Sequence, residues 1–205
     1  MSAELIVVDY GAGNLRSVET ALRHLEAGFS ISSSPDEVAA AERLIVPGVG
    51  EARAAMERLS ASGLDQAIDA FRRAGRPLLG ICLGCQIIFE RSDERSAHCL
   101  GFLPGTVRRF TPGPGRKVPH MGWNRVFITH PHPLFAEIAD GAFFYFVHSY
   151  YPQPAEAEVV IGECEYGQRF AAAVARDNLA ACQFHPEKSA QSGLRLLANF
   201  LRWKP

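Results

Sequence analysis

The sequence predicts an α/β fold, with a central and largely parallel sheet, helices on both of its faces and antiparallel strands added in the second half of the chain. In the first half, short apolar runs alternate with amphipathic segments, as buried parallel strands alternate with helices. In the second half, strand-like runs follow one another directly, as in antiparallel hairpins. The chain has 205 residues and 47% apolar content, enough for one full core, so we expect a single domain over residues 1–205.

The first half contains three predicted strands, each leading into a turn and a helix. The apolar run Leu5 to Asp9 precedes a helix that begins after Asn14, its expected N-cap. Leu44 to Val46 ends in Pro47-Gly48-Val49-Gly50, which we call the glycine loop. After a helical stretch and a helix around Leu64 to Phe71, the strand Pro77 to Ile81 runs into a turn at Cys82 and a helix predicted to continue through Phe89.

The second half contains six predicted strands and a closing helix. The strands are expected at Thr106 to Phe110, Asn124 to Ile128, Phe143 to His148, Val159 to Glu163, Phe170 to Arg176 and Leu179 to Phe184. The segment Thr111 to Gly115 is expected to be a short loop. Leu194, Leu197 and Leu201 recur at helical spacing, which predicts a helix over Ser192 to Trp203 that docks on the sheet.

Charge and composition exclude several classes of function. The net charge is -1, with 21 basic and 22 acidic residues, so the chain has no overall field to attract nucleic acid or an anionic membrane surface. No apolar run approaches the roughly 20 residues that cross a bilayer. The five cysteines form an odd and irregularly spaced set, unlike a disulfide framework. We expect a soluble cytoplasmic protein without an export leader.

The segment Gly80-Ile81-Cys82-Leu83-Gly84 fits the pattern glycine, any residue, nucleophile, any residue, glycine, at the point where a buried strand meets a helix. A tight turn there lifts the nucleophile out of the sheet, and the free N–H groups of the following helix favour a thiolate. The alternative is that Cys82 is an ordinary buried cysteine, since free cysteines are often buried. The elbow pattern alone does not decide between them.

The segment His185-Pro186-Glu187 favours the nucleophile. A thiol of ordinary pKa is mostly protonated near neutral pH, so it needs a base, and the base needs an orienting group. His185 can be the base. In an extended segment Glu187 would point to the same side and reach the far ring nitrogen of His185. The alternatives are a surface histidine in a turn and an acid that caps a helix.

Acyl transfer also needs N–H donors for the developing oxyanion. The backbone N–H of Leu83 is one candidate, and the glycine loop, near Val49 and Gly50, could present a second. From the sequence alone, an ordinary tight turn is the favoured explanation of that loop. No group of histidine, cysteine or acidic residues has the spacing of a metal site, so neither a metal nor a cofactor is expected.

Over essentially its whole length, the chain resembles the class I glutamine amidotransferases. The general motifs are Gly80-Ile81-Cys82-Leu83-Gly84-Cys85-Gln86 and His185-Pro186-Glu187. Four further segments resemble the glutaminase subunit of imidazole glycerol phosphate synthases, from histidine biosynthesis: Asp9 to Leu15, the glycine loop, His120 to Asn124 and Phe146 to Tyr150. The resemblance implies the three-layer fold of this family.

The resemblance also implies roles for residues that spacing alone does not reveal. Gln86 and Glu94 would contact the amino-acid head of glutamine, although Glu94 could equally be a solvated acid. The rest of the glutamine pocket would be backbone near Gly50 and the residues His148, Ser149 and Tyr150. The implied partner is a (β/α)8-barrel cyclase in a heterodimer, with Asn14, His120, Met121, Trp123 and Lys188 at the expected interface.

Cys85 departs from the family pattern, which more often has methionine or histidine there. It creates a formal Cys-x-x-Cys pair with Cys82, so a redox role or an oxidative off-switch is an alternative.

The expected function is hydrolysis of glutamine to glutamate through a thioester on Cys82, with ammonia passed to the cyclase. Two alternatives remain: a class I glutaminase that serves another synthase, and a catalytically silent subunit that binds glutamine for regulation.

Overall fold

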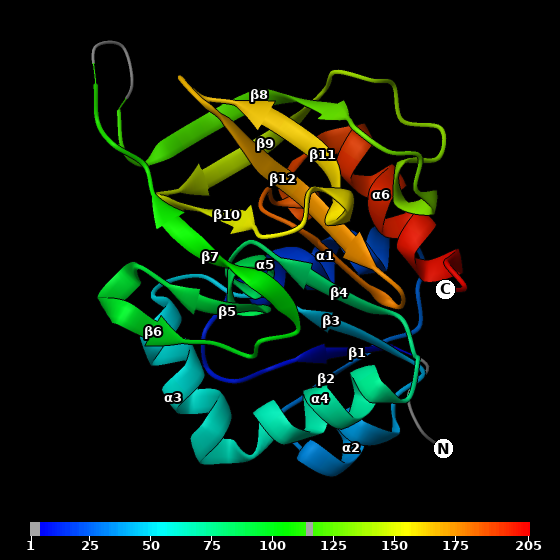
Figure 1. Cartoon of the computed structure of the whole chain (residues 1–205). Coiled ribbons are helices and arrows are strands. Elements are labelled where there is room, and N and C mark those ends of the chain that lie inside the picture. The colour runs from blue at the N-terminus through cyan, green and yellow to red at the C-terminus, as the bar shows by residue number, and fades with distance from the viewer. Residues whose placement is uncertain (1–4, 114–116) are drawn as a thin grey trace.

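The structure is a computed structural model that describes residues 5–113 and 117–205. Within these residues, a nine-stranded mixed sheet has the order β2-β1-β3-β4-β13-β12-β11-β8-β9 (Figure 1). Pairing is parallel from β2 through β13 and antiparallel from β13 to β9. The parallel strands are β1 (Leu5–Val8), β2 (Ser30–Ser32), β3 (Arg43–Val46), β4 (Leu78–Ile81) and β13 (Leu179–Cys182). The others are β8 (His120–Ile128), β9 (Ala142–His148), β11 (Val160–Glu165) and β12 (Arg169–Arg176).

Helices cover both faces of this sheet, which confirms the predicted three layers. Alternate residues of β1 show why: Leu5 and Val7 pack with one apolar cluster, and Ile6 and Val8 with another. The first cluster includes residues of α1 (Leu15–His24) and α6 (Ala190–Arg202). The second includes residues of α2 (Pro35–Ala40), α3 (Ala52–Ser62), α4 (Leu64–Arg73) and α5 (Leu83–Ile87).

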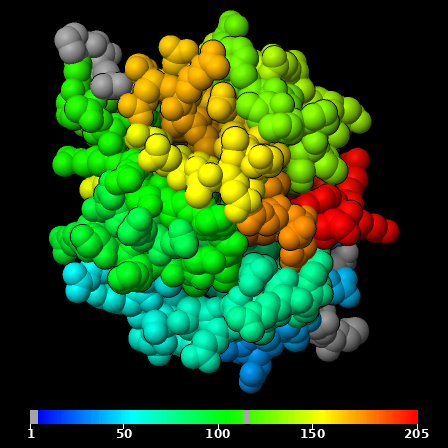
Figure 2. Space-filling model, in the orientation of Figure 1, coloured from blue at the N-terminus to red at the C-terminus, as the bar shows by residue number. Residues whose placement is uncertain are grey.

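A second sheet was not predicted. Among the described residues it has four strands in the order β10-β7-β5-β6, namely β10 (Tyr150–Pro154), β7 (Leu103–Arg109), β5 (Phe89–Ser92) and β6 (Ala97–His98). Figure 2 shows this sheet, in green and yellow, forming much of the surface above α3 and α4. The predicted helix through Phe89 is therefore wrong at its end, because α5 stops at Ile87 and Phe89 begins β5.

Other local predictions fare differently. Asn14 occupies the N-cap position of α1, but its side chain makes no capping hydrogen bond. The loop predicted at Thr111 to Gly115 lies partly outside the described residues. No helix of the described segments is both long and apolar enough to cross a membrane. Four 3-10 turns complete the described elements: η1 (Glu94–Ser96), η2 (Pro133–Phe135), η3 (Ala157–Val159) and η4 (Pro186–Lys188).

Candidate active site

Cys82 stands on a strained turn between β4 and α5. Its backbone has φ 55° and ψ -105°, a conformation that a non-glycine residue adopts only where the surroundings enforce it. The flanking glycines are required by close backbone contact: a Cβ on Gly84 would overlap the Val46 carbonyl oxygen, and one on Gly80 would lie 2.8 Å from the Gly84 carbonyl oxygen. The predicted elbow is therefore present in the structure.

His185 reaches the same end of the sheet from the neighbouring parallel strand. Ile81 of β4 pairs with Cys182 of β13, and the Cys82 N–H donates to the Cys182 carbonyl at 2.8 Å. His185 Nδ1 lies 2.7 Å from Glu187 Oε1, with both side chains almost fully buried. The predicted contact is present, although Glu187 lies in the 3-10 turn η4 instead of an extended segment.

Two competing effects set the pKa of His185. Burial lowers it, but the nearby Cys82 sulfur and the Glu187 carboxylate raise it more, to about 10. The other ring nitrogen, Nε2, is buried and has no hydrogen-bond partner in the described part of the chain. The imidazole is thus fixed at Nδ1 and open at Nε2, as expected for a group that exchanges a proton with a thiol or a substrate.

A cavity of about 310 Å³ opens above Cys82 and His185. It brings together every residue that the resemblance implied for the glutamine pocket, together with the predicted oxyanion residues. Its lining is Val49, Gly50, Cys82, Leu83, Gln86, Glu94, Pro119, Val147, His148, Ser149, Tyr150 and His185. Of these, Pro119 and Val147 were not singled out in the sequence, where neither carries a recognisable chemical signal.

The predicted oxyanion donors are only partly available. The Leu83 N–H donates to the Gly48 carbonyl at 3.3 Å, so one donor is already engaged by the glycine loop. The loop is held by Tyr10, whose hydroxyl donates to the Pro47 carbonyl at 2.9 Å. Val49 has 41% of its surface exposed. The loop therefore lies beside the nucleophile in a position that blocks one donor.

Gln86 and Glu94 both line the cavity, and both have structural partners. Gln86 Nε2 donates to the Tyr150 carbonyl at 3.1 Å and to Gln183 Oε1 at 3.0 Å. Glu94 Oε2 accepts from the Ala52 N–H at 2.8 Å, at the start of α3. Desolvation raises the pKa of Glu94, and the bond from Ala52 opposes that rise. Glu94 is accordingly not the fully solvated acid that was the sequence alternative.

The residues predicted for the partner surface differ in their exposure. Asn14 and Lys188 are exposed, and Met121 and Trp123 have 63% and 52% of their surface exposed. His120 is only 3% exposed, so its side chain is not available as a surface contact. This part of the expected interface lies on a strand, because His120 to Val126 of β8 pair with β9.

Cys85 does not share the environment of Cys82. It is fully buried in the apolar cluster that contains α3 and α4, whereas Cys82 belongs to the cluster on the other face of the sheet. Burial, with a smaller contribution from Cys82, raises the pKa of the Cys85 thiol. In the segments that the structure describes, no group of three or more histidine, cysteine or acidic residues could hold a metal ion.

A family model and curated relatives both match the chain. Residues 6–203 match the model described as glutamine amidotransferase class-I. The imidazole glycerol phosphate synthase subunit HisH of Thiobacillus denitrificans is 49% identical over 100% of this chain and 93% of its own. The protein of the same name from Dechloromonas aromatica is 50% identical over 98% of this chain and 97% of its own.

Solved structures share the fold at much lower identity. A glutamine amidotransferase structure aligns with a TM-score of 0.75 at 20% identity, covering 96% of this chain and 97% of the other. The PurLQS structure from Thermotoga maritima aligns with a TM-score of 0.71 at 19% identity, covering 98% and 99%.

Proposed function

Because the chain belongs to the class I glutamine amidotransferase family, we propose that it is the glutamine-hydrolysing subunit of an imidazole glycerol phosphate synthase. The observation that carries the catalytic part is the meeting of Cys82 and a Glu187-oriented His185 at one cavity beside a strained elbow. The pathway part rests on full-length similarity to relatives with that name. We further propose that residues 1–205 act as one amidotransferase domain.

In the proposed reaction, the Cys82 thiolate attacks the side-chain carbonyl carbon of glutamine and the carbonyl π electrons move to oxygen. The tetrahedral intermediate collapses, the C–N bond breaks, and His185 Nε2 gives its proton to the departing nitrogen, which leaves as ammonia. Water attacks the γ-glutamyl thioester while His185 takes up its proton, and the C–S bond breaks to release glutamate. Glu187 keeps the ring oriented throughout, through Nδ1.

The glycine loop has to change position during this cycle. Its Gly48 carbonyl accepts the Leu83 N–H, which is the donor expected to hold the oxyanion. When the loop moves away, Leu83 is released, and an N–H at Val49 or Gly50 becomes the second donor. A subunit that rests in the observed arrangement hydrolyses glutamine slowly. Strong glutamate release by the isolated chain would contradict this part of the proposal.

The same cavity accounts for binding of glutamine. Glu94 supplies a carboxylate for the α-ammonium group, and Ser149 and Tyr150 line the same cavity. Gln86 and His148 also line the cavity, and both contact the Tyr150 carbonyl. A carboxylate whose pKa is raised by burial gains from a cationic partner, which favours a substrate that carries an ammonium group.

The proposed partner is a (β/α)8-barrel cyclase that joins the ammonia to a phosphoribulosyl-formimino nucleotide. Products would be imidazole glycerol phosphate and an aminoimidazole carboxamide nucleotide. Met121, Trp123, Asn14 and Lys188 are its proposed contacts, since they are exposed. Two large apolar side chains on one strand are typical of a surface that a partner covers.

The test is glutamate release from glutamine by the chain alone, with the cyclase, and with the cyclase plus its nucleotide ligand, for the native protein and Cys82→Ala. We expect a rate that rises with partner and ligand and falls about a thousandfold or more in Cys82→Ala. Cys85→Ala is the matched control, because it removes a neighbouring thiol that does not line the cavity. Release that depends on Cys82 but not on this partner would contradict the pathway assignment, and release unaffected by Cys82→Ala would contradict the chemistry.

A further inference from the structure

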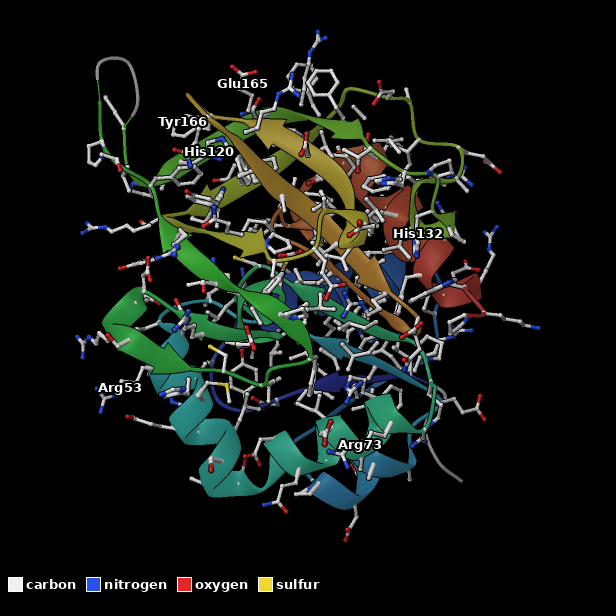
Figure 3. All side chains as sticks on the ribbon, viewed as in Figure 1. Arg53, Arg73, His120, His132, Glu165 and Tyr166 are labelled. Atoms are coloured by element: carbon white, nitrogen blue, oxygen red, sulfur yellow. The ribbon has the colours of Figure 1, made fainter. Side chains whose placement is uncertain are left out.

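A chain of hydrogen bonds begins at Asn124 on β8, which does not line the cavity, and runs inward to buried groups. Asn124 Nδ2 donates to the Glu165 carbonyl at 2.9 Å, and Asn124 Oδ1 accepts from the Arg125 N–H at 2.8 Å. These two backbone contacts fix which end of the amide is nitrogen. Nδ2 also lies 3.3 Å from His120 Nε2, so that ring nitrogen must accept. Figure 3 shows His120 beside Tyr166 and close to Glu165.

The chain continues through two histidines to the backbone of the cavity. His120 Nδ1 lies 2.9 Å from His148 Nε2, and His148 Nδ1 lies 2.7 Å from the Tyr150 carbonyl oxygen. A carbonyl only accepts, so His148 carries its proton on Nδ1. His148 Nε2 therefore accepts, and His120 must donate from Nδ1. With both rings neutral, these contacts allow only this arrangement of protons.

Aromatic packing keeps both rings neutral. His120 stacks between Tyr166 and Phe146, at centroid distances of 4.1 Å and 4.9 Å, and Phe110 and Phe170 pack against both histidines. Burial lowers the pKa of His120 to about 4 and, with repulsion from His120 and His185, that of His148 to about 3. A proton added to either ring would set two N–H groups against each other and break the chain.

On the other side of Tyr150, the chain reaches the nucleophile. The Tyr150 carbonyl also accepts from Gln86 Nε2, whose second hydrogen goes to Gln183 Oε1. Because Gln183 presents its oxygen to Gln86, its amide nitrogen faces Cys82, with Nε2 3.9 Å from Sγ. Gln183 is completely buried at the end of β13, two residues before His185.

We propose that Gln183 is a further catalytic residue, which donates an N–H to the Cys82 sulfur and stabilises the thiolate. We further propose that His120 is a positioning residue, which holds the Tyr150 carbonyl in place through His148. The proposal rests on the proposed function only in taking Cys82 as the nucleophile. The Tyr150 carbonyl can only accept, so Gln86 must present its Nε2 to it. The second hydrogen of that Nε2 needs an acceptor, so Gln183 must present its Oε1 to Gln86. Each step back along the chain to Asn124 is fixed in the same manner.

An N–H that donates to the Cys82 sulfur changes the balance between thiol and thiolate, whereas a side chain that only fills buried space does not. It favours the anion over the thiol, because hydrogen bonds to charged groups are about twice as strong as those between neutral groups. If the sulfur lost this donor, less thiolate would be present at low pH. Gln183 itself does not line the glutamine cavity, so substrate affinity should change less than turnover.

The first test is alkylation of Cys82 by iodoacetamide, followed on the Cys82 peptide by mass spectrometry. In Gln183→Met, which keeps length but has no N–H, the rate at about pH 6 relative to about pH 9 should fall about tenfold. The matched control is Asn178→Leu. Asn178 is a buried amide that precedes the same strand, and its Nδ2 donates to the Arg72 and Arg76 carbonyls. That variant should keep the native ratio.

The second test concerns His120. Substitution by Phe keeps the stack between Tyr166 and Phe146 but removes the donor, whereas Asn places an amide nitrogen near the position of Nδ1. We expect His120→Phe to lower the same alkylation ratio and His120→Asn to restore it. In the native protein, nitrogen-15 NMR should find both histidines neutral and protonated on Nδ1 at neutral pH.

Three results would overturn the proposal: an unchanged ratio in a folded Gln183→Met, an equal fall in Asn178→Leu, or a charged or Nε2-protonated ring at His120 or His148. The NMR measurement needs no variant, so misfolding of a mutant leaves the proposal testable. Alkylation needs neither glutamine nor cyclase. A failure here is therefore distinguishable from a failure of the proposed glutaminase function, which is measured by glutamate release.

Discussion

Two segments approach Cys82 from opposite sides, because β4 lies between β13 and β3 in the sheet. The turn after β13 carries His185, whose backbone N–H donates to Tyr145 and whose carbonyl accepts from the Ser189 hydroxyl. The glycine loop after β3 is exposed at Val49, and its Gly48 carbonyl occupies the N–H of Leu83. The side proposed for proton transfer is assembled, whereas the side proposed for the oxyanion is not. Control of the rate should therefore be exerted on the loop.

Glu187→Gln removes the carboxylate that contacts His185 Nδ1. We expect it to lower glutamate release by about a hundredfold to ten-thousandfold. The reason is that the neutral amide can still meet His185 Nδ1 but no longer fixes the tautomer or stabilises an imidazolium. The measurement is the rate with cyclase and ligand present. A loss of less than about tenfold would show that the ring is oriented by its burial alone.

The same variant should change how stability depends on pH. The pKa of His185 in the folded protein is about 10, above about 6.5 in an unfolded chain, so its contribution is complete below about pH 6.5 and is lost as pH rises toward 10. Glu187→Gln removes part of the cause and should flatten the decline in unfolding free energy over that range, measured by urea denaturation. A parallel decline in both proteins would contradict this assignment.

The elbow itself is tested by Gly84→Ala, because Gly84 lies where α5 meets the end of β3. An added Cβ would overlap the Val46 carbonyl oxygen, which is backbone and has little room to yield. We expect a loss of about 3 kcal/mol of stability together with most of the activity. Gly28→Ala is the control, since its Cβ would meet nothing within 4 Å, and it should change stability by less than about 0.5 kcal/mol. Similar melting temperatures for the two variants would be evidence against a tightly packed elbow.

The sequence predicts the assembled side better than the rest. Continuous apolar runs such as Leu5 to Val8 are buried on both faces, and a nucleophile between close-packed glycines leaves a local pattern. Pairing between distant segments leaves no such pattern: β10 pairs with β7 in the second sheet, and no periodicity in either strand identifies its partner. The burial of His120 likewise depends on rings from β9, β12 and the turn before it, and was therefore missed.

The hydrogen bonds of the cavity could not be predicted from the sequence for the same reason. In the sequence, Gln183 appears only as part of the strand predicted at Leu179 to Phe184. Its role depends on Gln86, which is 97 residues away in the chain. The position of the Gly48 carbonyl is similarly beyond sequence reasoning, because a glycine loop is compatible with several peptide orientations. Residue types indicate which chemistry is available locally, whereas only the three-dimensional structure shows whether a given N–H donor is free or already bonded.

Tyr10→Phe should release the glycine loop, and we expect its effect on glutamate release to be the smallest of these variants. Tyr10 is buried, and its hydroxyl holds the loop through the Pro47 carbonyl. Loss of one such bond costs the observed loop position about 1 kcal/mol, equivalent to about fivefold in a population. We therefore expect glutamate release by the isolated chain to rise up to about fivefold, while the rate with cyclase and ligand stays constant, because the loop is then already displaced.

Tyr151→Phe is the matched control for that variant, since Tyr151 packs on Phe110, at a centroid distance of 4.5 Å, and not on the loop. It should leave both rates unchanged. If Tyr10→Phe instead lowered the isolated and the stimulated rates together, the observed loop position would be the active one. The Leu83 N–H would then have to serve the oxyanion while it remains bonded to Gly48. Control by the partner would have to act on the His185 side instead of on the glycine loop.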